Sequence, residues 1–375
     1  MYTEEQKNWV QEFLSRCESK VGAVMGDIQK DYPYTTVDGK YDNEKAYVPF
    51  GWTSGFYGGI MWLLYQQTGD EKYKQRAIRC SQRMNGAFSD PKNFHCIDNH
   101  DVGFVIGLTN VNHYRLLGDD DAKTRAHHAA LVLAGRYNLS GSFLRAWQGD
   151  SHRGYAIIDC LMNLPLLYWA GEHCGDSRFS QIAKAHALTT AREFIKPDGS
   201  VYHIVNFDPD TGSVVDYPVG QGIASGSSWS RGQSWSIYGF ALSYGYTGDP
   251  VFLKAARGTA DYVMTHMEPG TLAPADFMQP AKPDLRDASA TAIIASGMLE
   301  LAKYCENGQD YENFALGLLK ALYRDCDFGT EEQSLLQSCT MRYHDTPEQH
   351  IPIIYGDYFL IEALMKAAGK EPGMW

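Results

Sequence analysis

The residues best suited to chemistry stand at the starts of strongly apolar segments. They are Trp52, His100, Asp101, Asp159, Arg231, Trp235, Asp287 and Asp357. If the apolar segments form parallel helices, these side chains converge at one end of the molecule. The positive ends of the helix dipoles would favour an anion there. The arrangement therefore predicts a site that attracts a negatively charged ligand.

Asp159 is the most unusual of these residues. It follows two isoleucines and precedes Cys-Leu-Met, and a carboxylate in so apolar a run is costly unless it is paired or functional. Pro165 favours a helix that starts nearby, with Asp159 at its mouth. Asp101 has the same placement one hairpin earlier, and two carboxylates in one pocket would repel, which raises one pKa and makes that group an acid. For Asp287 and Asp357, helix capping is favoured over catalysis.

Other polar and aromatic residues extend the candidate site. Gln221 and Arg231 lie in a Ser- and Gly-rich segment, and Arg231 could grip a carboxylate through a two-pronged pair or form a structural salt bridge. His203 is either an ordinary loop histidine or a substrate contact. For Trp52 and Trp147 we favour a platform under a sugar ring over a place in the core.

A repeated helical hairpin must position these residues. An apolar segment, a short Gly-Asp-like turn and a more polar segment recur five times, with turn glycines 49 to 73 residues apart at Gly69, Gly118, Gly175, Gly248 and Gly308. Gly suits the left-handed position after a helix, and Asp caps the next helix. A sixth apolar segment, 354–369, would pair with the N-terminal amphipathic segment.

Six hairpins can close into an all-α (α/α)6 barrel, with apolar helices inside and amphipathic helices outside. An open solenoid is the alternative, which we favour less because the two ends look complementary and neither resembles a polar cap. We expect one catalytic domain over residues 1–375. The stretch 197–230 is rich in Gly and Asp and predicts a short hairpin and loop over the active-site end.

Composition excludes several classes of protein. The net charge of −12 disfavours nucleic acid and anionic membranes. Eight cysteines without a Cys-X-X-Cys pair indicate reduced, mostly buried thiols and no zinc site. No signal peptide or membrane-spanning run is evident, so we expect a cytoplasmic protein.

Four segments together resemble the unsaturated glucuronyl hydrolases of glycoside hydrolase family 88. They are HDVGF (100–104), IIDCLMNLPLLYWA (157–170), SWSRGQSWSIYGF (228–240) and IYGDYFLIEAL (354–364). The resemblance extends over essentially the whole chain and implies an (α/α)6 barrel. The related unsaturated rhamnogalacturonyl hydrolases share that fold, but the Met-Asn-Leu-Pro run at 162–165 is more similar to the glucuronyl group.

The resemblance also implies roles. Asp159 matches the general acid/base and Asp101 the second essential carboxylate. The substrate-binding positions match Trp52, His100, Trp147, His203, Gln221, Arg231 and Trp235. The implied reaction removes a terminal 4,5-unsaturated glucuronic acid from lyase-generated oligosaccharides such as glycosaminoglycan disaccharides, by hydration of the C4=C5 vinyl ether. It needs no metal or other cofactor.

Two rival interpretations remain at this stage. A sugar epimerase on the same barrel would rely on paired catalytic histidines, and a non-catalytic carbohydrate-binding protein has no reason to place carboxylates in apolar helix starts. We expect a monomer or weak homo-oligomer, while the second sugar and its linkage are left open. The loop 344–353 has Asp345 and Glu348 but no Ser or Lys, which predicts a preference for unsulfated substrates.

Overall fold

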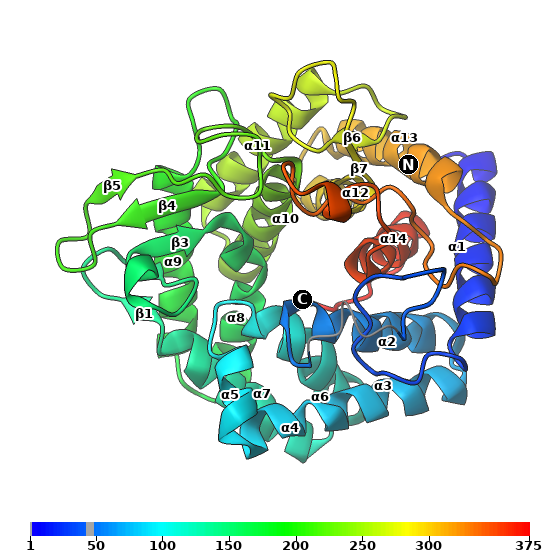
Figure 1. The fold of residues 1–375 in the computed structure, drawn as a ribbon, viewed down its shortest axis with the longest axis horizontal. Helices are drawn as coiled ribbons and strands as arrows, with labels where there is room; N and C mark the ends of the chain where they lie inside the picture. The colour runs from blue at the N-terminus through cyan, green and yellow to red at the C-terminus, as the bar shows by residue number, and fades with distance from the viewer. Residues whose placement is uncertain (1, 43–48) are drawn as a thin grey trace.

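The computed structural model describes residues 2–42 and 49–375, and it confirms the (α/α)6 barrel. Six helical segments of the described chain form an inner ring (Figure 1): α2 (Phe56–Thr68), η2 with α6 (Gly103–Val111 and Asn112–Leu117), α8 (Leu164–His173), α10 (Ser230–Thr247), α12 (Ala288–Ala302) and α14 (Ile354–Ala367). An outer ring surrounds them: α1 (Glu4–Val24), α3 (Glu71–Arg83), α7 (Asp120–Ala134), α9 (Arg178–Glu193), α11 (Pro250–His266) and α13 (Gly308–Asp325).

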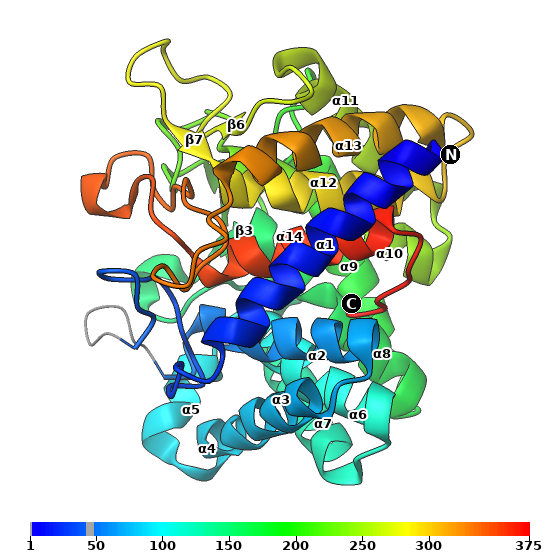
Figure 2. The same ribbon diagram turned by 90° about the vertical axis from the view of Figure 1, so that its right-hand side faces the viewer.

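The ring closes through the two ends of the chain. Helix α14 packs against both α12 and α2, and α1 packs against α14 as its outer partner. Figure 2 shows α1 crossing the side of the barrel beside α13 and α14. The first and last helices therefore make the sixth hairpin, and the open solenoid is ruled out.

The burial patterns explain which helices are inside. Every residue of α12 from Ala288 to Leu301 is buried, as expected for a helix packed on all sides. The outer helix α3 instead buries only Tyr73, Ala77, Cys80 and Ser81, a single stripe with the period of an α-helix. Burial of each large apolar side chain contributes about 1.5–3 kcal/mol.

The Gly-Asp turns adopt the expected geometry at most hairpins. Gly69 ends α2 with φ 70°, and the carboxylate of Asp70 accepts a hydrogen bond from the backbone N–H of Lys72 at 2.9 Å. The same arrangement is found at Gly118–Asp119 and Gly248–Asp249. The last turn differs, because Gly308 is the first residue of α13 and follows Asn307 as N-cap. The prediction of a left-handed turn glycine was wrong there.

Three small antiparallel sheets and several short helices occupy the connecting loops. The strands are β1 (Tyr137–Asn138) with β2 (Phe143–Leu144), β3 (Tyr155–Ile157) with β4 (Ile204–Phe207) and β5 (Val214–Asp216), and β6 (Ala273–Pro274) with β7 (Arg286–Asp287). The short helices are η1 (Trp52–Gly55), α4 (Asn85–Ser89), α5 (Pro91–Ile97), η3 (Asp150–His152), η4 (Ile158–Met162) and η5 (Thr346–Glu348). Strands β4 and β5 form the hairpin predicted within 197–230.

Among the described residues, no helix combines the length and the apolar character needed to cross a bilayer.

Candidate active site

A cavity of about 220 Å³ opens where the starts of the inner helices meet. Its walls are formed by Trp52, His100, Asp101, Trp147, Ile157, Asp159, His203, Gln221, Arg231, Met341 and Arg342. Eight of the nine residues to which the family resemblance assigns a catalytic or substrate-binding role are in this set, and Trp235 is the exception. The volume is below the range of about 300–1,000 Å³ that is usual for drug-sized ligands. It suits one sugar ring.

The sheet β3–β4 brings Asp159 and His203 together. Ile157 pairs with Ile204 in the antiparallel register, and the backbone N–H of the next residue, Ile158, donates to the carbonyl of His203 at 3.0 Å. The chain then turns into η4, so the carboxylate of Asp159 lies opposite the imidazole. Nε2 of His203 is 3.3 Å from Oδ1 of Asp159.

The backbone around Gly220 fixes the tautomer of His203. The N–H of Gln221 donates to Nδ1 of His203 at 3.0 Å, so Nδ1 is an acceptor and a neutral ring carries its proton on Nε2, facing Asp159. A Cβ on Gly220 would lie 1.8 Å from Nδ1, which no side chain could tolerate. Gly220 is therefore needed for this contact.

Asn163 connects the segment that carries Asp101 to the segment that carries Asp159. Its amide oxygen accepts from the N–H of Phe104 at 2.7 Å, and its amide nitrogen donates to the carbonyl of Asp159 at 3.3 Å. The side chain is fully buried. Gly103 allows the approach, because a Cβ there would lie 2.6 Å from the amide oxygen of Asn163.

The two carboxylates have opposite pKa shifts. Burial raises the pKa of Asp101 well above its usual value, and the negative charge of Asp159 raises it further. Burial also opposes ionisation of Asp159, but its contact with His203 and the charges nearby lower its pKa below the usual value. These directions favour Asp101 as the proton donor of the pair and Asp159 as the carboxylate. The sequence predicted that repulsion between the two carboxylates raises one of their pKa values, and the raised pKa is that of Asp101. The role of Asp159 as general acid/base, which the resemblance implies, stays a prediction.

His100 completes the acidic centre as a neutral ring. Burial lowers its pKa to about 3, and its Nε2 lies 3.4 Å from Oδ1 of Asp101. Both ring nitrogens are buried and make no hydrogen bond to any described residue. The ring meets Trp147 edge-on, with centroids 6.4 Å apart.

Arg231 is held by the protein itself. Its Nη1 donates to Asp287 at 3.1 Å and to the carbonyl of Thr340, and its Nη2 donates to Oε1 of Gln221 at 2.7 Å and to the carbonyl of Met341. Arg231 thus forms the structural salt bridge with Asp287, and its Nη1 and Nη2 atoms bond to the protein, while its contact with a ligand stays a prediction. Arg231 also orients Gln221, whose amide nitrogen has no partner among the described residues and is free to donate.

Residues 23–345 match glycosyl hydrolase family 88. The chain belongs to this family. It is 35% identical to the unsaturated glucuronyl hydrolase of Bacillus sp. (strain GL1) over 86% of this chain and 88% of that protein. It is 30% identical to the unsaturated chondroitin disaccharide hydrolase of Streptococcus pyogenes serotype M1, over 91% and 87% respectively. The chain is a glycoside hydrolase.

Solved structures agree with the family assignment. The unsaturated glucuronyl hydrolase of Bacillus sp. GL1 has a TM-score of 0.88 and 32% identity over 95% of this chain and 96% of its own. The unsaturated glucuronyl hydrolase from Streptococcus agalactiae has a TM-score of 0.91 and 29% identity over 98% and 94%.

The three tryptophans that were candidate site residues differ in position. Trp52 and Trp147 line the cavity as expected for sugar platforms, and the Trp52 ring packs 4.9 Å from that of Tyr355. Trp235 is fully buried against Phe104 and Phe359 and does not line the cavity. Its position in the second turn of α10 points it into the barrel core, so direct substrate contact by Trp235 is not supported in this conformation.

The remaining acidic candidates have structural roles in the hydrolase. Asp287 caps α12, accepting from the N–H groups of Ser289 and Ala290. Asp357 does not cap a helix, as its carboxylate accepts from the backbone of Leu335 and Leu336 and so anchors that loop. Burial raises its pKa to about 6.

Sequence reasoning missed Ile157, Met341 and Arg342 among the lining residues. Arg342 is the informative omission, because its side chain is 54% exposed and its charge stands at the cavity wall. The only local signal for it was its own positive charge, two residues before the acidic loop 344–353. Within residues 2–42 and 49–375, no three His, Cys, Asp or Glu side chains converge as metal ligands would.

Proposed function

We propose that this hydrolase removes a terminal 4,5-unsaturated glucuronic acid from lyase-generated oligosaccharides by hydrating the C4=C5 bond. The observation that carries the proposal is the pair of carboxylates, Asp101 and Asp159, whose pKa values shift in opposite directions in a cavity for one sugar ring. A vinyl ether needs this combination, a proton donor for one carbon and a base for the water that adds to the other.

The relatives support this substrate class. A solved variant of the Streptococcus agalactiae unsaturated glucuronyl hydrolase, 27% identical to this chain, is complexed with dGlcA-GalNAc6S. Another solved relative, 32% identical, is described with dGlcA-Glc-Rha-Glc. Both ligands begin with the same unsaturated uronate, which is the unit that we place in the cavity.

The binding groups suit a planar sugar acid. Trp52 and Trp147 offer aromatic faces to the ring. The amide N–H₂ of Gln221, held by Arg231, donates to the substrate carboxylate, and the buried positive charge of Arg231 stabilises that anion from behind. The inner helix starts add their dipoles.

The chemistry then takes two steps. Asp101 donates its proton to C4, and positive charge develops at C5, where the ring oxygen shares it. Asp159 accepts a proton from a water molecule that adds its oxygen to C5, while His203 holds the carboxylate in place. The resulting C5 hemiketal opens, and the exposed C1 hemiacetal releases the second sugar. The spacing rule for carboxylates that displace a group at C1 does not apply here.

Isotope labelling tests the proposal. Turnover of an unsaturated chondroitin disaccharide in heavy water should place one deuterium at C4, and ¹⁸O-labelled water should place its oxygen at C5. Mass spectrometry and NMR of the product locate both labels. Oxygen label at C1, or no loss of the C4=C5 absorbance, would exclude this reaction.

Three further properties accompany the proposal. We infer one catalytic domain over residues 1–375, a cytoplasmic location and a monomer or weak homo-oligomer. Cell fractionation and light scattering of the purified protein test the last two directly.

A further inference from the structure

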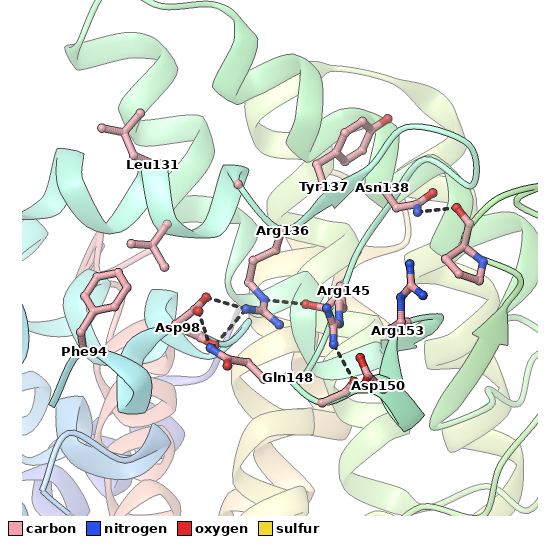
Figure 3. A pocket seen from close by; sticks show the side chains of 14 residues that line it. Phe94, Asp98, Leu131, Arg136, Tyr137, Asn138, Arg145, Gln148, Asp150 and Arg153 are labelled. Atoms are coloured by element: carbon pink, nitrogen blue, oxygen red, sulfur yellow. Dashed lines mark hydrogen bonds and ion pairs between the residues drawn. The ribbon is translucent and has the colours of Figure 1, made fainter. Parts of the chain in front are cut away.

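A second, larger cleft lies outside the active-site cavity, between α5, α7 and the β1–β2 hairpin. It has a volume of about 650 Å³. Figure 3 shows three arginine side chains on its wall, Arg136, Arg145 and Arg153. We call it the arginine cleft. The concentration is unexpected in a chain with a net charge of −12.

One of the three arginines, Arg153, offers exposed donors to a ligand. Arg136 is neutralised by Asp98, with Nη1 and Oδ1 2.7 Å apart. Arg145 uses Nη2 on the carbonyl of Gly149, but its Nε is buried and has no hydrogen-bond partner among the described residues. The guanidinium of Arg153 is exposed and makes no ion pair within residues 2–42 and 49–375.

The carboxylates of the lining leave a net positive charge. Asp98 is engaged by Arg136 and also accepts from Gln148. Asp150 is exposed, and it makes no ion pair with any described residue. Three arginines against these two aspartates give the cleft one excess positive charge. An exposed guanidinium beside excess positive charge is suited to a carboxylate or sulfate.

The arginine cleft and the active-site cavity share a thin wall. Trp147 lines the active-site cavity and the next residue, Gln148, lines the cleft. On the facing segment, Asp98 lines the cleft and His100 lines the cavity. The side chain of Gln148 donates to the carbonyl of Asp98 at 3.0 Å, so the two segments meet between the two spaces. A ligand that crosses Trp147 and Gln148 would pass from one to the other.

We propose that the arginine cleft binds an anionic sugar unit, a pyranose that carries a carboxylate or a sulfate. Because the active-site cavity holds one ring, the other sugar units of a longer substrate lie outside it. The first possible source of the bound unit is therefore an anionic sugar of the same oligosaccharide. This source rests on the proposed function. A separate anionic saccharide is the second source and does not depend on it.

Two measurements distinguish the sources. The first compares kcat/KM for an unsaturated disaccharide and an unsaturated tetrasaccharide prepared from the same glycosaminoglycan, in the wild-type enzyme and in Arg153→Gln. The second measures calorimetric binding of a saturated glucuronate-bearing disaccharide, which has no C4=C5 bond to hydrate. Arg178→Gln is the control for loss of a surface arginine, since Arg178 is also exposed, begins α9, pairs with Asp176 and does not line the cleft.

If the unit belongs to the same chain, Arg153→Gln lowers the tetrasaccharide-to-disaccharide ratio of kcat/KM by about three- to tenfold, as for one partly exposed charge-assisted hydrogen bond. If the ligand is a separate molecule, that ratio stays constant and binding of the saturated disaccharide weakens by a similar factor. Arg153→Lys should restore part of either effect. If Arg153→Gln and Arg178→Gln match the wild type in both measurements, the cleft is not such a site. Failure of the wild type to hydrolyse the disaccharide would instead overturn the proposed function.

Discussion

Burial raises the pKa of both Asp101 and Asp159, and the difference between them arises from their neighbours. His203 presents a ring N–H to Asp159 because its other nitrogen accepts from Gln221. His100, next to Asp101, is neutral and has no hydrogen bond to orient it among the described residues. One carboxylate therefore has a donor that favours its charge, while for the other burial and a negative neighbour outweigh the positive charge of Arg136. Two similar residues thus acquire opposite roles.

Exchange of each carboxylate for an amide should separate those roles. Asp159→Asn and Asp101→Asn should each lower kcat by ~10²–10⁴ with helix content unchanged. Azide needs no base to attack C5, so azide should partly rescue Asp159→Asn and not Asp101→Asn. The readout is the rate of loss of the C4=C5 absorbance at increasing azide. If azide rescued only Asp101→Asn, the roles would be the reverse, with Asp159 as the acid and Asp101 as the base.

The pH profile gives an independent check on the same pair. Activity requires protonated Asp101 and ionised Asp159. Because the pKa of Asp101 is raised, kcat/KM should fall on the alkaline side only above that raised pKa, well above the usual carboxylate range. Because the pKa of Asp159 is lowered, the acid limb should appear only below the usual carboxylate range. An acid limb retained in Asp159→Asn would assign it to another group.

Glu348 and Arg342 should govern the response to a charged second sugar. Arg342 Nε lies 3.6 Å from Glu348, whose side chain is partly buried and whose pKa burial raises. We still predict faster turnover of unsulfated disaccharides, since Glu348 offsets the cation. Glu348→Gln should free Arg342 and raise the 6-sulfated to unsulfated ratio of kcat/KM by about three- to tenfold. Arg342→Gln should lower that ratio, and equal ratios in all three proteins would show that the loop does not reach the second sugar.

At the scale of elements, Asn163 explains why a Met-Asn-Leu-Pro run follows Asp159 so closely. One amide links η2 to η4 and so fixes the two carboxylate-bearing segments relative to one another. Asn163→Ala should lower kcat by about 10- to 100-fold, because small misplacements of reacting groups are expensive. KM should change less, and steady-state kinetics on the disaccharide measure both.

Asn112 provides the matched control for Asn163. It is also buried, and its amide donates to the carbonyls of Gly107 and Met374, away from the cavity. Asn112→Ala should lower the unfolding midpoint about as much as Asn163→Ala while leaving kcat near the wild-type value. A similar loss of kcat in both variants would reduce Asn163 to a general stabilising residue.

The elements show where sequence reasoning reached its limit. The apolar segment after Asp101 was expected to be an ordinary helix, yet Gly103–Val111 is a π-helix. An apolar run has the same appearance in either form, and the contact with Asn163 comes from a segment 59 residues away. Likewise Ile157 ends strand β3, because its partner Ile204 belongs to a distant loop. Pro165 was a local signal, and α8 does begin at Leu164.

At the scale of the whole molecule, the fold could be predicted because the same sequence pattern of apolar helix, turn and amphipathic helix is repeated along the chain. Each hairpin carries its own period and turn, and errors at a single turn, such as Gly308, do not change the ring. The site depends instead on loops that cross between hairpins. Most residues that line the cavity could be named from the sequence. The hydrogen bonds that engage Arg231 and the packing that buries Trp235 could not, because both depend on tertiary contacts that no local pattern contains.

The inner helices of the barrel are also joined by a tertiary contact, made by Trp375, that local sequence patterns do not reveal. Trp375 lies among three inner helical segments, with its ring stacked on Phe359 at 6.0 Å and near Phe104 and Tyr238. Its indole N–H donates to the buried Glu362 at 2.7 Å. Since the ring touches η2, α10 and α14 at once, it should stabilise the barrel as a unit.

Trp375→Ala should lower the free energy of unfolding by about 2–4 kcal/mol, somewhat less than loss of a fully buried Trp. Trp375→Phe keeps the stacked ring but loses the N–H, so it should cost about 1 kcal/mol. Chemical denaturation measures both variants. Because Trp375 does not line the active-site cavity, disaccharide kcat should stay within about twofold for the folded variants. Unchanged stability in Trp375→Ala would show that the barrel does not depend on this contact. A loss of kcat well beyond twofold in a variant that is still folded would mean that the packing around Trp235 and Phe104 affects the active site.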